Sequence, residues 1–207
     1  MGLGLRNVVL QSNEKYEYML FNIRKYSYKQ TNLYELNKLG ADGWEVICDL
    51  GEDILLKKKY IVTTNGIMVQ YIIKNTSPIA LKAKFVVESN FAQTCFNKDS
   101  FSSYKIEVVN DNQVENKTPD NLEFMRNVDA FQIVDSDNNV VFTFEPNETA
   151  NLVTYPIVFM RKKTDSTDLE PAGRTLSISL AWDVDLAAGM EMEKTINLAI
   201  VPGKKRK

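Results

Sequence analysis

The chain has 207 residues, enough for one large domain or two small ones. Its hydrophobic fraction of 44% and charged fraction of 25% are ordinary for a globular protein with a core. A formal net charge of -2 excludes a strongly basic surface, so we expect no nucleic-acid partner. Histidine is absent, which excludes Ser-His and Cys-His nucleophile pairs and removes the commonest metal ligand.

The two cysteines, Cys48 and Cys95, lie in apolar stretches at a spacing that matches no metal-binding motif. We interpret both as small buried hydrophobic residues and expect no metal or other cofactor. Residues 1–10 lack the apolar run of a signal peptide. No segment approaches the roughly 20 apolar residues that a membrane-spanning helix needs. The sequence therefore predicts a cytoplasmic protein without a membrane span.

The N-terminal part predicts a small α+β module with the order βαββ. Aromatic residues favour a first strand, Thr31 or Asn32 can cap a short helix, and Gly40 ends it. An Asp-Gly turn then leads into two further strands. The expected elements are a strand over 16–24, a helix from 31 or 32 to 39, and strands over 44–48 and 53–62.

This part of the chain resembles a small domain of unknown function that many bacterial proteins carry. The resemblance rests on four motifs: Tyr-Glu-Tyr at 16–18, Leu-Tyr-Glu-Leu-Asn-Lys-Leu-Gly at 33–40, Gly-Trp-Glu-Val at 43–46 and Leu-Leu-Lys-Lys at 55–58. It implies a fold and no chemistry, because that family has no assigned activity.

The rest of the chain alternates apolar and polar residues, as β-strands do. Residues 67–74 and 81–88, joined by Asn-Thr-Ser-Pro, predict an antiparallel hairpin. Polar residues at 135–139 predict a hairpin turn. The weakly patterned segment 110–127 predicts a long loop. Further strands are expected at 103–109, 128–135, 139–145, 152–161, 174–184 and 191–201, which together favour a β-sandwich.

This second region resembles the C-terminal β-sandwich of α-amylase and 4-α-glucanotransferase enzymes of glycoside hydrolase family 57. The stretches that carry the resemblance are 69–77, 85–91, 131–135 leading to 155–157, and 176–189. The resemblance implies a galactose-mutarotase-like supersandwich. It also implies that the catalytic carboxylates belong to an N-terminal barrel, which this chain does not contain. After Pro156 the chain has Phe-Met-Arg-Lys-Lys where that family has an acidic, serine-containing stretch.

We therefore predict a mainly β protein, an antiparallel β-sandwich of the galactose-mutarotase-like supersandwich type preceded by a small βαββ module. The expected division is 1–61 for the α+β module, 62–202 for the sandwich and 203–207 for a basic tail. Four consecutive cations in the tail could contact phosphates or acidic partners, but we interpret them as a solvated chain end.

Three residues are candidates for ligand binding. Glu88 and Asn90 are two residues apart on one strand, so they share a sheet face and could hold sugar hydroxyls; an exposed polar face is the alternative. Trp182 could stack on a sugar ring, although its place after Leu176, Ile178 and Leu180 equally fits the core. We expect both Trp182 and Phe85 to be buried.

Asp183 and Asp185 are also two residues apart and could reach a cation. No third ligand accompanies them in the sequence, so solvated side chains are the alternative reading.

The sequence favours a non-catalytic binding or assembly module whose partner is a glycan or another protein, with homo-oligomerisation open. The alternative is a degenerate or unrecognised carbohydrate-active enzyme. Hydrolysis of a glycosidic bond needs two carboxylates that flank it, and the sequence singles out no such pair. We therefore predict that the protein is not an enzyme.

Overall fold

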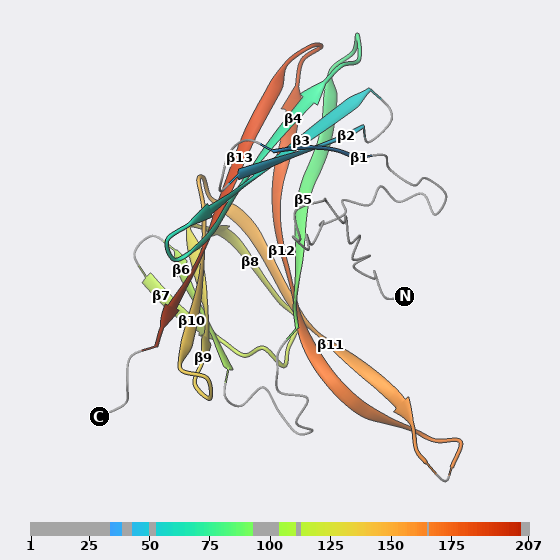
Figure 1. Ribbon diagram of the computed structural model, residues 1–207, viewed down its shortest axis with the longest axis vertical. Helices are drawn as coiled ribbons and strands as arrows, with labels where there is room; N and C mark the ends of the chain where they lie inside the picture. Colours follow the sequence, from blue (N-terminus) through green and yellow to red (C-terminus); the bar gives the residue numbers. More distant parts are fainter. Residues whose placement is uncertain are drawn as a thin grey trace.

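The computed structural model describes residues 34–38, 43–49, 53–92, 104–110, 113–164 and 166–203. Within these ranges thirteen strands form two antiparallel sheets, and there is no helix (Figure 1). The larger sheet contains, in spatial order, β1 (Tyr34–Lys38), β2 (Gly43–Asp49), β3 (Ile54–Thr63), β4 (Gly66–Asn75), β13 (Glu191–Pro202), β10 (Val140–Pro146), β9 (Ala130–Asp135), β6 (Tyr104–Asn110) and β7 (Gln113–Lys117). The smaller sheet contains β5 (Leu81–Ala92), β12 (Leu169–Leu186), β11 (Ala150–Lys162) and β8 (Glu123–Val128).

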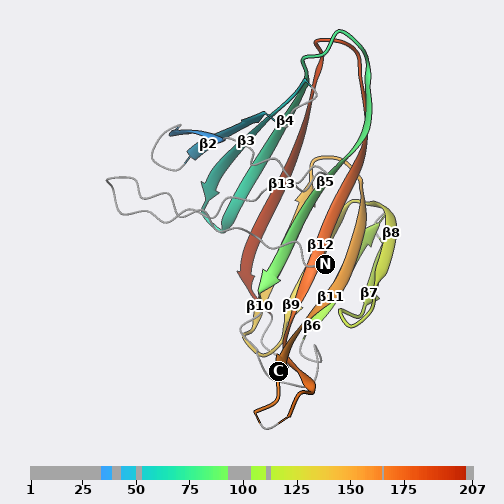
Figure 2. The same cartoon turned by 90° about the vertical axis from the view of Figure 1, so that its right-hand side faces the viewer.

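The two sheets pack face to face as a sandwich (Figure 2). Alternation along the strands places every second side chain between the sheets. On β12 the inward residues run from Leu176 to Leu186, and on β4 they include Val69, Tyr71 and Ile73, all of them buried. The prediction of a mainly β, antiparallel sandwich is confirmed.

The helix expected over 31–39 is wrong in the part that the structure describes. Tyr34–Lys38 is the strand β1, which pairs in register with β2 from Tyr34 opposite Cys48 to Lys38 opposite Trp44. The leucine spacing also suits a strand, and pairing with β2 provides backbone hydrogen bonds that a short helix would have to make alone. The strands expected at 44–48 and 53–62 correspond to β2 and β3. The strand expected at 16–24 lies outside the described residues.

The hairpin expected between 67–74 and 81–88 is also wrong. Both segments are strands, but β4 belongs to the larger sheet and β5 to the smaller one. The connection between them is an arch that crosses from one sheet to the other. Buried Asn75 holds the arch in place. Its side-chain nitrogen Nδ2 donates to the backbone carbonyls of Ile79, Leu186 and Ala187. Its side-chain oxygen Oδ1 accepts a hydrogen bond from the backbone N–H of Ser77.

The turn expected at 135–139 is confirmed and connects β9 to β10. Asp135 organises it, because its carboxylate accepts backbone N–H bonds from Asp137 and Asn138, each 3.0 Å long, and a 2.7 Å bond from the Asn138 amide. Burial alone would raise the pKa of Asp135. The hydrogen bonds from Asn138, Tyr104 and Asp137 outweigh that effect and lower the pKa below its usual range.

The long loop expected at 110–127 contains two strands, β7 and β8. Both lie at sheet edges, and most of their side chains are exposed. On β7 exposure of both faces removes the apolar alternation that marks a half-buried strand, and on β8 only Met125 and Val128 contact the core.

The boundary expected between residues 61 and 62 falls inside β3. β3 pairs with β4 along its whole length, from Ile54 opposite Asn75 to Thr63 opposite Gly66, so the sheet does not break there. Independent folding of 1–61 and 62–202 stays a prediction, and the basic tail from residue 204 lies outside the described residues. Within the described ranges there is no helix long and apolar enough to cross a membrane.

Candidate functional site

A polar pocket of about 210 Å³ opens where the β10–β11 connection meets β12 and β13. Trp182, which is buried, is among the residues that surround it. The polar side chains that line it come from four parts of the chain: Asn127, Glu148, Thr149, Asn151, Asp183 and Lys194. The exposed lining is almost entirely polar, and Trp182 lies largely buried behind it.

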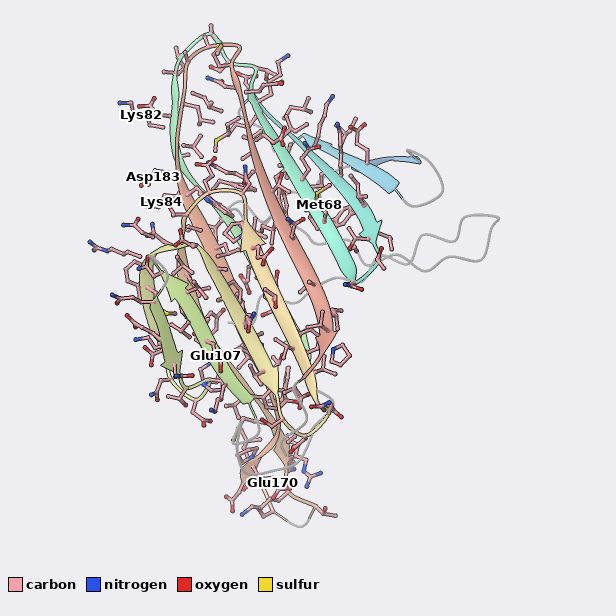
Figure 3. All side chains as sticks on the ribbon, turned by 90° about the vertical axis from the view of Figure 1, so that its left-hand side faces the viewer. Met68, Lys82, Lys84, Glu107, Glu170 and Asp183 are labelled. Carbon is pink, nitrogen blue, oxygen red and sulfur yellow. The ribbon has the colours of Figure 1, made fainter. Side chains whose placement is uncertain are left out.

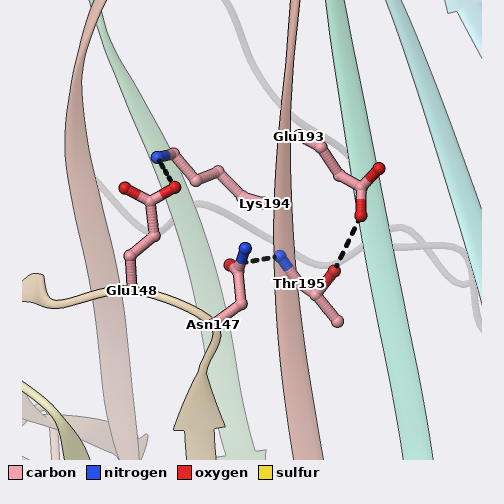
Figure 4. A network of polar contacts seen from close by, with 5 residues as sticks. All are labelled: Asn147, Glu148, Glu193, Lys194 and Thr195. Carbon is pink, nitrogen blue, oxygen red and sulfur yellow. Dashed lines mark hydrogen bonds and ion pairs between the residues drawn. The ribbon is translucent and has the colours of Figure 1, made fainter.

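An ion pair forms one wall of this pocket (Figure 4). Lys194 is an inward-facing residue of β13 and is buried, and its Nζ lies 2.5 Å from Oε1 of Glu148, which is 54% exposed. The turn that carries Glu148 is fixed to β13 by two hydrogen bonds, from Asn147 N to Thr195 O and from Thr195 N to Asn147 Oδ1. The positive charge of Lys194 is thus balanced by the negative charge of Glu148 within the pocket.

Trp182 is 5% exposed, as expected for a core residue. Its ring stacks against Phe85 with centroids 5.9 Å apart, and Nζ of Lys194 lies 6.0 Å from its centroid. Within the described part of the chain, its buried Nε1 has no hydrogen-bond partner. Trp182 is therefore both a core residue and a pocket residue, and Phe85 is buried as expected.

Tyr71 faces the same interior region from β4, directly opposite Lys194 on β13. Burial, with a smaller contribution from Tyr60, raises the pKa of the Tyr71 phenol above its usual value. The phenol therefore remains neutral at physiological pH. Its ring packs edge-on against Phe85 at 5.5 Å, which connects the larger sheet to the ring stack on the smaller one.

Glu88 and Asn90 lie on the opposite face of the smaller sheet from Trp182, because their neighbours Phe85 and Val87 point into the core. Asn90 donates from Nδ2 to Glu88 Oε1 at 3.2 Å, and Ser177 Oγ lies 3.4 Å from the same oxygen. The structure thus brings Glu88 and Asn90 together but does not bring them to Trp182. Their role in ligand binding stays a prediction.

Asp183 and Asp185 each face a lysine across the β5–β12 ladder. Lys84 pairs with Asp183, and Lys82 lies 3.4 Å from Asp185. These carboxylates are exposed cross-strand ion pairs. In the described ranges no group of three or more cysteine, aspartate or glutamate side chains could hold a metal ion.

Sequence reasoning missed Lys194 and Glu148. The signal for Lys194 is present in the sequence, because it occupies an inward position of an alternating strand between Met192 and Ile196. A lysine at such a position needs an anionic partner. Nothing in the sequence identifies Glu148 as that partner, because the two residues meet only through the β10–β13 pairing.

Solved structures similar to this chain share its fold. The 4-α-glucanotransferase of Thermococcus litoralis superposes with a TM-score of 0.55 at 17% identity, over 80% of this chain and 22% of that one. A galactose mutarotase-like protein of Lactobacillus casei gives 0.58 at 10% identity, over 81% and 73% of the two chains. A putative aldose 1-epimerase of Escherichia coli K12 gives 0.58 at 10% identity, over 95% and 79%.

No curated protein matches the chain in sequence. The chain spans about a fifth of the length of the glucanotransferase, so it corresponds to one part of that enzyme. A family model described as "Alpha-amylase/4-alpha-glucanotransferase, C-terminal" matches residues 4–160. The match begins earlier and ends earlier than the expected range of 62–202, and it covers more than half of the sequence. The resemblance of the N-terminal motifs to the small bacterial domain stays a prediction. The chain belongs to the α-amylase/4-α-glucanotransferase C-terminal family.

Proposed function

We propose that this protein is a non-catalytic carbohydrate-binding module that uses the pocket beside Trp182. The proposal rests on a pocket that is lined by amide, hydroxyl and already paired charged groups and that lies beside the buried indole ring of Trp182. Lys194 pairs with Glu148, and Asp183 pairs with Lys84. A site of this kind favours an uncharged ligand with many hydroxyl groups over an ion.

The size of the pocket limits how much of a glycan it could hold. Its volume of about 210 Å³ is below the roughly 300–1,000 Å³ of pockets that enclose drug-sized ligands. It suits one sugar unit, with the rest of a chain in solvent. The buried Nε1 of Trp182 would gain a partner if a ligand hydroxyl reached it.

The absence of catalysis is part of this proposal. The chain contains no histidine, and a glycosidase needs one carboxyl group that stays protonated opposite a second that is ionised. Glu148 forms an ion pair with buried Lys194 at the pocket. Glu88 accepts hydrogen bonds from Asn90 and Ser177 on the other face of the sheet. The two carboxylates therefore do not share a site.

Calorimetric titration with maltose and longer maltooligosaccharides tests the binding. We expect similar affinities along the series, because one unit fills the pocket. Glu148→Gln should weaken binding about tenfold, since it removes a charged hydrogen-bonding group. Glu145→Gln, at an exposed position of β10, is the matched control. Loss of binding in Glu88→Gln but not in Glu148→Gln would move the site to the outer face of the smaller sheet.

A hydrolysis screen on the same α-glucans tests the absence of catalysis. We expect no release of reducing ends. Release that persists through purification and disappears in Glu148→Gln or Glu88→Gln would show that the protein is a carbohydrate-active enzyme.

A further inference from the structure

β8 carries a β-bulge beside the pocket. Its register against β11 shifts between two pairs of residues, Ala150 with Val128 and Leu152 with Met125. One residue of β11 lies between these pairs, but two residues of β8 do, so β8 has one extra residue there. Such bulges often redirect a side chain next to a binding site. Ala150 is part of the pocket lining, which places the bulge at the pocket.

The bulge brings two carboxamides to the same pocket. Asn151 is the β11 residue between the two pairs, and Arg126 and Asn127 are the β8 residues opposite it. Arg126 is held elsewhere, because its guanidinium lies 5.7 Å from the centre of the Phe124 ring. Asn127 and Asn151 both line the pocket. Neighbouring strands lie about 4.8 Å apart, so carboxamides on facing residues can contact one sugar unit.

Asn127 holds a backbone conformation that its own contacts do not explain. Its φ angle is +54°, in the left-handed region that residues other than glycine seldom adopt. Within the described part of the chain, its exposed side chain makes no hydrogen bond that would stabilise this conformation. Glycine would adopt the same backbone without strain. A strained residue in a pocket lining, with no structural role for its side chain, indicates a role in binding.

We propose that Asn127 and Asn151 determine which sugar the pocket accepts, by contacting two adjacent ring hydroxyls of one sugar unit. This inference rests on the proposed function, because it assigns roles within the same pocket. A carboxamide has one acceptor oxygen and two N–H donors, and a hydroxyl both donates and accepts, so each carboxamide can satisfy one hydroxyl. Lys194 and Glu148 are already paired with each other, which favours the amides as the groups that distinguish neutral ligands.

The configuration of the sugar should then decide its affinity. The ring hydroxyls of a hexopyranoside lie on three consecutive carbons, so every adjacent pair includes the middle one. Inversion at that carbon directs the middle hydroxyl to the other face of the ring and leaves one carboxamide without its partner. A site that hydrogen-bonds a hydroxyl discriminates strongly against a ligand that cannot supply it. The protein should therefore distinguish methyl α-glucoside from methyl α-alloside, its epimer at the middle carbon.

Titration of the full chain with these two glycosides, followed by NMR, tests the inference. The parent protein should bind the glucoside about tenfold more tightly. In Asn127→Gly the two affinities should come within about threefold of each other, because glycine keeps the backbone conformation and removes the carboxamide. Asn139→Gly is the matched control and should keep the preference, since Asn139 has a φ angle of +53° but lies outside the pocket lining. Asn151→Ala should lose the preference as Asn127→Gly does.

The outcomes separate this inference from the proposed function. Equal affinities of the parent for the two glycosides, or a preference that survives in Asn127→Gly or Asn151→Ala, would overturn the inference and leave a sugar-binding pocket. A parent that binds neither glycoside nor any maltooligosaccharide would overturn both. Thermal melts give an independent reading. Asn127→Gly should shift the melting temperature no more than Asn139→Gly does, and a clearly larger loss would show that the Asn127 side chain is structural.

Discussion

The two faces of the β5–β12 pair differ in how they hold the protein together, although one backbone ladder builds both. The inner face carries the stacked rings of Phe85 and Trp182, with Tyr71 of the other sheet packed against Phe85. The outer face carries Lys84 with Asp183, Lys82 with Asp185, and Glu88 with Asn90. Figure 3 shows Lys82, Lys84 and Asp183 pointing away from the sandwich.

The direction in which a side chain points therefore decides how much that residue contributes to stability. An inward aromatic ring loses contact with water and gains many close contacts, whereas an exposed ion pair remains hydrated. Neighbours in sequence, such as Trp182 and Asp183, should therefore differ severalfold in the cost of their removal.

The largest effect is expected at Trp182. Trp182→Ala should lower the free energy of unfolding by about 3–5 kcal/mol, because it leaves a cavity beside Phe85. Urea denaturation measures the change, with Asp183→Ala as the control on the other face. Lost glycan binding with unchanged stability would instead make Trp182 a binding platform that the core does not need.

Asp135 is a carboxylate that faces inward, so it combines the chemistry of the outer face with the burial of the inner one. Asp135→Asn should lower the free energy of unfolding at pH 7 by about 1.5–3 kcal/mol, since bonds to a charged acceptor are lost. The pKa of Asp135 is lowered in the folded state, so its contribution is present above the ordinary aspartate pKa. That contribution is lost as the pH falls through the folded-state pKa.

Urea denaturation at a series of pH values from neutral to acid checks this sign. The parent protein should lose more stability on acidification than Asp135→Asn does. The exposed Asp185→Asn should follow the parent. Equal acid sensitivity of the parent and Asp135→Asn would contradict the role assigned to the turn.

Ser177 separates the effect of facing outward from the effect of exposure. It lies on the outer face yet is fully buried, and its hydroxyl contacts Glu88. Ser177→Ala should lower the free energy of unfolding by about 0.5–1.5 kcal/mol, the net contribution of one hydrogen bond. The same urea titration measures the change. If Ser177→Ala lowered the free energy of unfolding as much as Trp182→Ala, burial alone would determine how much a residue contributes to stability, whichever face it lies on.

The smallest effect is expected at Lys84. Lys84→Ala removes an ion pair whose side chains are 65% and 78% exposed, so the free energy of unfolding should fall by only about 0.2–1 kcal/mol. The difference between variant and parent should shrink further at high salt, because ions screen exposed charges. A salt-independent cost would contradict this account.

Strands with one buried face could be predicted from the sequence. Leu176, Ile178, Leu180 and Trp182 show the two-residue period directly, and the structure buries all four. β7 could not be predicted, since its two exposed faces lack that period, and β8 has only Met125 and Val128 as apolar residues that contact the core. A helix was wrongly predicted over 34–38 because the leucines in and around this segment fit helical spacing. The segment is a strand because it pairs with β2, and that pairing cannot be seen in the segment's own sequence.

The pairing partners of the strands could not be predicted from alternation. β4 and β5 each alternate and are separated by a turn-like Asn-Thr-Ser-Pro, which is the pattern of a hairpin. Tyr71 and Phe85 do meet, but across the core between the two sheets. Alternation identifies which side chains face inward and leaves open whether two strands meet edge to edge or face to face.

The candidate site depends on the same kind of information. Trp182 could be singled out as an aromatic at the end of an apolar face, whereas Glu148 lies in a turn that resembles any other polar turn. Its role follows from the pairing of β10 with β13, which brings Pro146 opposite Ile196 and so places the turn over Lys194.

The place of β13 in the larger sheet also governs the order in which that sheet can be completed. β13 lies between β4 and β10, so β1–β4 and the group of β10, β9, β6 and β7 are joined through it. Both groups precede it in the chain, and they can form local hairpins while synthesis continues. Until residues 191–202 leave the ribosome, however, the edges of β4 and β10 stay open. During that interval the nascent protein is most exposed to mispairing with other chains.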